Sequence, residues 1–295
     1  MSFCGRMVFR SRISIFFAGT IGLGGLYGLQ NAGVLGGLLQ LHGPPVAASS
    51  AILSEHDLEA INAMAPQDQA IRLLERTVNH YQGASAEIAK RADGWIGQVH
   101  SDPKLRSLSE TAYYSNDLRV RAAALEIWRV EAGYRKTPET VDQLIDAARV
   151  EPTRLYFLLS HLAILGNRGV EPSKVFGTLM HYARDPDGSA RAAAINGLGL
   201  LGTESTIAPL LEIFHGDTSA DLRERAACNL ADSGMLSREL RLKAVPELVR
   251  FSQDSSLDQQ TRKWVYQALR EITKQSLSED PAAWVSWLAA QNGRP

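Results

Sequence analysis

From residue 54 onward, apolar side chains recur every three or four residues, the spacing that places them on one face of an α-helix. Ser54 followed by Asp57 is typical of a helix N-terminus, and Pro66 fits the first turn of a second helix. No run alternates apolar and polar residues as a half-buried strand does. The pattern therefore predicts an all-α protein.

One short pattern, Asp-x-x-x-Arg, opens an apolar helical run three times. An aspartate at the start of a helix accepts hydrogen bonds from its free N–H groups, and an arginine one turn later lies on the same face, within reach of that aspartate or of an acid in the adjoining repeat. The copies lie 70 and then 71 residues apart. Half of that interval, about 35 residues, is a typical size for helical-hairpin repeats. The residues that we expect to be structural are Asp117, Arg121, Asp187, Arg191, Asp258 and Arg262, with Arg223 at the equivalent position of a weaker copy.

A second marker keeps the same period. Proline is tolerated in the first turn of a helix, where its missing N–H is not needed. Prolines mark the expected second helix of each pair at intervals of 34, 37 and 37 residues: Pro138, Pro172, Pro209 and Pro246. Two independent markers with one period predict an α-solenoid, a stack of antiparallel helix pairs.

Residues 187–211 resemble a known type of repeat. The run Asp187-Gly-Ser-Ala-Arg191-Ala-Ala-Ala-Ile-Asn-Gly-Leu198-Gly199-Leu-Leu-Gly202, with Thr206-Ile-Ala-Pro209-Leu-Leu after it, is similar to a HEAT repeat of the short bacterial type. The resemblance extends over residues 115–275. It implies that the second helices line a concave face that binds other macromolecules. Some members of the family attach or isomerise bilin pigments, but no matching site occurs in this sequence.

Composition and periodicity divide the chain into four segments. Residues 1–48 form a signal peptide or membrane anchor with a short linker, and residues 49–114 form an N-terminal helical region of degenerate repeats or a separate cap. Residues 115–275 form the HEAT-like array. In residues 276–295, Trp284 and Trp287 predict a last helix that caps the array, because an array exposes an apolar face at its end.

The first segment is typical of an export signal or an anchor. Residues 13–41 carry no charge, three arginines precede them, and no further Lys or Arg occurs before Arg72. This charge bias favours an extracytoplasmic location, such as the periplasm, for the rest of the chain. Small residues near Ala48 suit cleavage by a signal peptidase, whereas the length of the apolar stretch suits an anchor that contacts the membrane through residues 13–41. Both alternatives stay open.

Charge argues against a nucleic-acid partner. All 32 acidic residues follow residue 54, whereas three of the 31 basic residues precede residue 13, so that residues 49–295 have a net charge of about −4. A phosphate backbone requires clustered Lys and Arg. We expect no nucleic-acid binding.

Candidate chemistry in the sequence has simpler explanations. The glycines of Gly197-x-Gly199-x-x-Gly202 match a dinucleotide fingerprint, but they lie at the end of a helix and not between a strand and a helix. Close packing and helix termination explain them better. The seven histidines show no metal-ligand spacing, and no nucleophile motif occurs. We therefore expect no catalytic residue, no cofactor, no metal and no enzyme activity.

These observations favour a non-catalytic extracytoplasmic scaffold that binds a protein or peptide on the concave face of the solenoid. The residues expected to line that face, all on second helices, are Tyr182, Arg184, Phe214, His215, Arg250 and Phe251. Phe214 and Phe251 suit a core position equally well. Two alternatives remain, an enzyme or cofactor- or pigment-handling repeat protein and a structural membrane-associated protein without a tight ligand.

Overall fold

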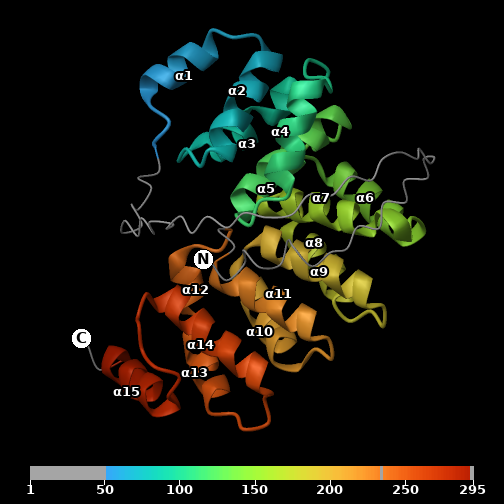
Figure 1. Cartoon of the computed structure of the whole chain (residues 1–295). Coiled ribbons are helices and arrows are strands. Elements are labelled where there is room, and N and C mark those ends of the chain that lie inside the picture. The colour runs from blue at the N-terminus through green and yellow to red at the C-terminus, as the bar shows by residue number, and fades with distance from the viewer. Residues whose placement is uncertain (1–50, 233–234, 293–295) are drawn as a thin grey trace, which may run out of the picture.

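A computed structural model describes residues 51–232 and 235–292, which form a stack of helices from α1 at one end to α15 at the other (Figure 1). Apart from an isolated parallel bridge between Ile52 and Gln82, these residues contain no β-structure. The all-α prediction is confirmed. None of the helices within these two ranges is both long and apolar enough to cross a membrane. The predicted signal or anchor lies outside the described residues.

Four helices precede the repeats. They are α1 (Glu55–Asn62), α2 (Pro66–Val78), α3 (Ala84–Trp95) and α4 (Pro103–Tyr113). Ser54 and Asp57 form a reciprocal capping box at the start of α1, as the sequence predicted, and the Asp102 side chain caps α4. Helices α3 and α4 both pack on α5, which begins the repeats.

The repeats alternate first and second helices. The first helices are α5 (Leu118–Glu131), α7 (Leu155–Asn167), α9 (Gly188–Leu201), α11 (Ala220–Ala231) and α14 (Gln259–Thr273). The second helices are α6 (Pro138–Val150), α8 (Pro172–Tyr182), α10 (Ile207–Gly216), α13 (Val245–Ser252) and α15 (Pro281–Asn292). Two 3-10 turns, η2 (Pro152–Arg154) and η3 (Glu204–Thr206), and a short helix, α12 (Arg238–Leu242), complete the described elements.

The first helices stack on one another in chain order, and the second helices α6, α8, α10 and α13 each pack against the first helix that follows. Helix α5 also contacts α9, so the first helices are closely stacked at this point. The predicted solenoid of stacked helix pairs is confirmed.

Both sequence markers occupy the predicted places. Asp117, Asp187 and Asp258 are the N-caps of α5, α9 and α14, where their carboxylates accept backbone N–H groups at 2.8–3.0 Å. The four prolines lie in the first turns of α6, α8, α10 and α13. Each cap satisfies donors that would otherwise lack a partner at the helix terminus.

Helix α5 is buried on two sides because it belongs to two apolar clusters. Leu118, Ala122 and Leu125 pack with the repeats, whereas Val120 and Ile127 pack with the N-terminal helices. At the other end, α15 packs on α13, with Trp284 fully buried. This position is the one expected of a capping helix. The boundaries of the four sequence segments stay a prediction.

Candidate functional site

Four of the six residues predicted to line a partner surface have accessible side chains, near the C-terminal ends of second helices. Tyr182 ends α8 and Arg184 follows it, while His215 lies in the last turn of α10 and Arg250 in that of α13. Arg184 and Arg250 are exposed, and Tyr182 and His215 are half-buried. We call these four residues the second-helix surface.

Phe214 and Phe251 do not belong to this surface. Both side chains are buried, and their rings pack edge to face between α10 and α13 with centroids 6.3 Å apart. Each follows the proline of its own helix by five residues, so they occupy the same core position in consecutive repeats. Their assignment as partner-binding residues is wrong, and the core interpretation holds.

His215 and Asp254 form the one His–carboxylate pair on the second-helix surface. His215 Nε2 lies 2.8 Å from Asp254 Oδ2. The Ser256 hydroxyl and then His215 donate hydrogen bonds that hold the pKa of the Asp254 carboxyl well below its usual range. In a nucleophilic triad the serine bonds to the histidine, whereas here Ser256 Oγ bonds to Asp254 at 2.6 Å. The pair connects α10 to the end of α13 and lacks the geometry of a triad.

Arg191 and Arg223 connect successive repeats. The guanidinium of Arg191 forms hydrogen bonds of 2.9 and 3.2 Å with Asp217, which precedes α11. Arg223 in turn lies 2.9 Å from Asp258, the N-cap of α14. The prediction that a motif arginine reaches an acid of the adjoining repeat is confirmed for Arg191 and is wrong for Arg121 and Arg262, while Arg223 of the weaker copy also reaches such an acid. We call Arg191 and Arg223 with these two partners the arginine ladder.

The other two motif arginines bind neutral groups. Arg121 donates to Asn196 of α9 and to the carbonyl of Ser115, both at 2.8 Å. Arg262 donates to the carbonyl of Leu257 at 2.9 Å. All of these contacts are internal, which agrees with the structural role that the repeat pattern indicated.

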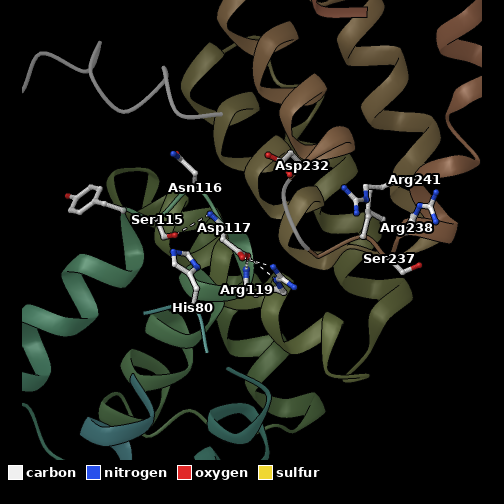
Figure 2. A pocket seen from close by; sticks show the side chains of 11 residues that line it. His80, Ser115, Asn116, Asp117, Arg119, Asp232, Ser237, Arg238 and Arg241 are labelled. Atoms are coloured by element: carbon white, nitrogen blue, oxygen red, sulfur yellow. Dashed lines mark hydrogen bonds and ion pairs between the residues drawn. The ribbon is translucent and has the colours of Figure 1, made fainter. Parts of the chain in front are cut away.

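A polar pocket of about 660 Å³ lies away from the second-helix surface, between the α4–α5 turn and the segment around α12 (Figure 2). One wall comes from residues near the start of α5, and the opposite wall comes from the end of α11 and from α12. The lining residues are His80, Tyr114, Ser115, Asn116, Asp117, Arg119, Asp232, Leu236, Ser237, Arg238 and Arg241. None of them was predicted as a binding residue.

The three arginines of this pocket differ in their contacts. Arg119 is held by Asp117 through two hydrogen bonds of 3.1 and 2.7 Å. Arg241 Nη1 donates to the carbonyl of Ala231 at 2.6 Å, while its buried Nε has no partner. Arg238 is exposed and forms neither a hydrogen bond nor an ion pair with any described residue. The pocket thus presents positive charge that the chain itself leaves partly unneutralised.

The stack from α7 to α11 coincides with a known repeat. The family described as HEAT repeats matches residues 160–231, from the middle of α7 to the end of α11. These residues are similar to HEAT repeats. A search of curated proteins finds no match to the chain. The described chain as a whole has the fold of a HEAT-like solenoid.

Within the HEAT repeats, the glycines of the apparent dinucleotide fingerprint serve packing. A Cβ atom on Gly197 would lie 2.4 Å from Leu179 of α8, and one on Gly199 would lie 2.6 Å from Asn229 of α11. Gly202 ends α9 at φ +57, a left-handed conformation that favours glycine. The expectation that packing and helix termination explain this motif is confirmed.

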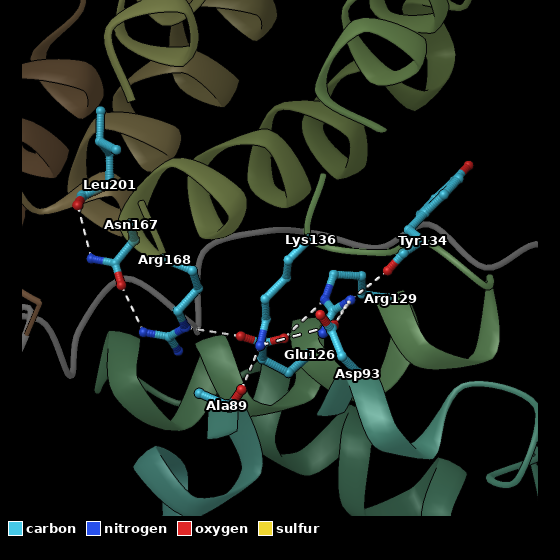
Figure 3. Close-up of polar contacts among 9 residues, drawn as sticks. All are labelled: Ala89, Asp93, Glu126, Arg129, Tyr134, Lys136, Asn167, Arg168 and Leu201. Atoms are coloured by element: carbon cyan, nitrogen blue, oxygen red, sulfur yellow. Dashed lines mark hydrogen bonds and ion pairs between the residues drawn. The ribbon is translucent and has the colours of Figure 1, made fainter. Parts of the chain in front are cut away.

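A buried ion network joins the N-terminal helices to the HEAT repeats (Figure 3). Glu126 and Arg129 of α5 are fully buried and lie 2.9 Å apart. Arg129 also lies 2.8 Å from Asp93 of α3, and Glu126 accepts a hydrogen bond of 2.9 Å from Arg168 after α7. Burial lowers the pKa of Lys136, which donates to a carbonyl of α3 beside this network. The contacts of these charges are internal, so the network is structural.

The sequence predicted the second-helix surface, whereas it did not predict the pocket. Periodicity points to the second-helix surface, because Tyr182, His215 and Arg250 recur near helix ends. The pocket combines residues more than a hundred positions apart, and α12 carries no repeat marker. Within the described ranges, no group of three or more His, Cys, Asp or Glu residues is arranged to hold a metal ion.

Proposed function

We propose that the chain is a non-catalytic scaffold that binds a protein or peptide partner outside the cytoplasm. The observation that carries the proposal is the HEAT-like solenoid itself, whose quasi-periodic faces offer extended binding surfaces. The titratable clusters of the described residues support it further. The arginine ladder, the buried ion network and the His215–Asp254 pair all have internal partners that account for them.

The second-helix surface is the proposed partner surface. Tyrosine and arginine are the residue types enriched among those that dominate interface energies. Tyr182 and Arg184 provide them at the end of α8, and Arg250 provides one in the last turn of α13. Arg250 lies over the ring of Phe251, with 5.2 Å between its guanidinium carbon and the ring centroid, and Glu247 holds its other side. This arrangement orders the arginine before binding, which lowers the entropic cost of an interface.

The location outside the cytoplasm rests on the sequence of residues 1–48. Three arginines, an uncharged apolar stretch and the absence of further basic residues before Arg72 support export. Whether residues 13–41 stay as an anchor or are removed near Ala48 is decided by one measurement, the mass of the N-terminal peptide of the mature protein. A peptide that begins at Ser49 means cleavage.

The test of the scaffold function is a crosslinked pull-down from the native cell envelope with a C-terminal tag, followed by mass spectrometry. We expect one stoichiometric protein partner that is lost from the variants Tyr182→Ala and Arg250→Glu. The matched control is Arg72→Glu, which changes an exposed arginine on α2, far from the second-helix surface in the stack (Figure 1). Retention of the partner by all three variants would exclude the second-helix surface. Failure to capture any protein, with the chain still outside the cytoplasm, would favour the structural role.

A further inference from the structure

The polar pocket between the α4–α5 turn and α12 is a local concentration of positive charge on a molecule whose folded part is negative. Arg119, Arg238 and Arg241 line it together with two acids, Asp117 and Asp232. Figure 2 shows the two groups of side chains facing each other across the opening, with Arg238 and Arg241 on the α12 wall. Long-range attraction of polyanions is weak, since residues 49–295 carry about −4, so any anion must be recognised within the pocket.

The contacts within the pocket leave two arginines to recognise such an anion. Asp117 caps α5 and binds Arg119, and this bonding, with the nearby charge of Asp232, raises the pKa of the Arg119 guanidinium. Both acids thus act on Arg119. Arg238 forms no hydrogen bond or ion pair with a described residue, although its charge and that of Arg241 help to lower the pKa of Glu239, and the buried Nε of Arg241 has no hydrogen-bond partner. The exposed guanidinium of Arg238 can therefore pair with a carboxylate without first breaking an ion pair within the chain.

Tyr114 adds an aromatic anchor at the same opening. Its side chain is 61% exposed, and it is the one aromatic residue among the exposed large hydrophobic residues of the described ranges. The ring packs edge to face on Tyr113, which in turn packs on Trp128 with centroids 4.8 Å apart. An exposed tyrosine on a rigid base beside an arginine without an ion pair, Arg238, is the composition of a protein-binding hot spot.

A second, more apolar pocket of about 590 Å³ shares Arg238 with the first. Leu242, Val245, Trp287 and Leu288 line it, between α12, α13 and α15. Arg238 therefore stands between a cationic site and an apolar one. A ligand that spans both must carry acidic and apolar groups a short distance apart.

We propose that these adjoining pockets bind an acidic peptide segment of a partner protein, with carboxylates at Arg238 and Arg241 and apolar side chains at Tyr114 and in the second pocket. Pockets for small molecules are mostly apolar, whereas Ser115, Asn116 and Ser237 here offer neutral polar groups that suit a peptide backbone. Nucleic acid needs more cationic contacts than the pocket contains. This site is separate from the second-helix surface, and neither requires the other.

The experiment is fluorescence anisotropy of the full-length chain in detergent, with a fluorescein-labelled nonapeptide of three Glu-Glu-Leu units as the probe. A second probe has glutamine in place of every glutamate. We expect the acidic probe to bind in the micromolar range, with affinity that falls as salt is added, and the glutamine probe to bind at least about tenfold more weakly. Arg238→Glu is expected to weaken binding of the acidic probe by at least about tenfold, because it places like charge against the carboxylates.

Two further variants separate binding from folding. Arg135→Glu changes an exposed arginine outside both pockets, and it is expected to bind the acidic probe as the unchanged chain does. Arg241→Gln tests the half-buried arginine, with thermal unfolding as the check on its fold. Equal binding of both probes, or binding that Arg238→Glu leaves unchanged, would overturn the proposal. So would Arg238-dependent binding of a single-stranded RNA oligomer that is tighter than that of the acidic probe.

Discussion

Gly202 combines two constraints in one residue, because it adopts φ +57 at the end of α9 and lies against the backbone of Met235. A Cβ atom there would lie 2.8 Å from the Cβ of Met235 and 3.0 Å from its carbonyl carbon. Gly169 also has a positive φ, +87, but a Cβ atom on it would meet nothing within 4 Å. Substitution of Gly169 therefore tests the strain of a positive φ alone, whereas substitution of Gly202 tests this strain together with a close contact.

We expect Gly202→Ala to lower the free energy of unfolding by about 2–4 kcal/mol, since overpacking adds to the strain of a left-handed alanine. Gly169→Ala carries only the strain and is expected to lose about 1 kcal/mol. Urea denaturation of both variants and of the unchanged chain measures the difference. Equal losses would mean that Met235 moves away freely and that packing does not select the glycine.

His161 is a buried histidine whose protonation opposes folding. Its Nδ1 lies 2.9 Å from the carbonyl oxygen of Phe157, and its Nε2 is buried without a partner. Burial, with the charges of Arg129 and Arg154, lowers the pKa of His161 from 6.5 to about 4, against the opposing effects of the Phe157 carbonyl and Glu126. The folded state thus holds the neutral ring.

Below pH 6.5 the unfolded chain takes up a proton at His161 that the folded chain does not take up until pH falls to about 4. Stability from this residue is complete above pH 6.5 and is lost as pH falls toward 4, by up to about 3 kcal/mol. Urea titrations of the unchanged chain and of His161→Leu at several pH values in this window measure the effect. The stability of the unchanged chain relative to His161→Leu is expected to fall by up to about 3 kcal/mol as pH falls from 6.5 to 4, since other groups titrate alike in both. Parallel curves would contradict the prediction.

At the scale of the element, a helix could be predicted wherever a local rule determined its start. Asp117, Asp187 and Asp258 were assigned as helix starts from their spacing, and each is an N-cap because a carboxylate satisfies the free N–H groups of the first turn. Helix α12 carries neither the Asp-x-x-x-Arg pattern nor a first-turn proline, and the sequence did not predict it. Phe214 shows another limit, because helical spacing fixes which residues share a face but not whether that face meets core or solvent.

The arginine ladder gives neighbouring repeats a specific alignment. Replacement of Arg191 tests this role. The side chains of Arg191 and Asp217 are only 17% and 6% exposed, so removing the arginine leaves a largely buried carboxylate without its partner. We expect Arg191→Ala to lower the free energy of unfolding by about 2–4 kcal/mol.

The matched control is Arg149→Ala, whose partner Asp146 lies at a similar distance but with both side chains mostly exposed. Exposed pairs contribute little, so a change below about 0.5 kcal/mol is expected from chemical denaturation. If Arg191→Ala unfolded like the unchanged chain and yet failed to capture the partner, Arg191 would be a binding residue and its structural assignment would fail.

At the scale of the whole molecule, the solenoid was predictable and the pocket was not. Each repeat follows local rules that recur along the chain, so two markers with one period were enough to predict the stack. The pocket depends on how far successive helices rotate, which brings Arg119 opposite Asp232. That rotation is set by side-chain packing over several helices, and Asp117 is the one residue of the pocket that carries a periodic marker.

The buried ion network couples the N-terminal helices to the HEAT repeats. Glu126 accepts hydrogen bonds of 2.9 Å from both Arg129 and Arg168, and its side chain is fully buried. Replacing it by glutamine leaves Arg168 without its counter-charge and Arg129 with Asp93 alone, which we expect to destabilise the protein by about 3–5 kcal/mol. Because Arg129 also contacts Asp93 of α3, the loss should concentrate at the junction of the two apolar clusters.

Hydrogen exchange with mass spectrometry locates that effect. In Glu126→Gln, amides of α1 to α4 are expected to exchange faster than those of α9 to α14, and urea unfolding is expected to separate into two transitions. Glu151→Gln is the control, since it removes the same charge from an exposed pair with Arg154 at 2.7 Å and lies outside the network. Faster exchange throughout the chain with a single transition would mean that apolar packing on α5, and not the ion network, couples the two parts.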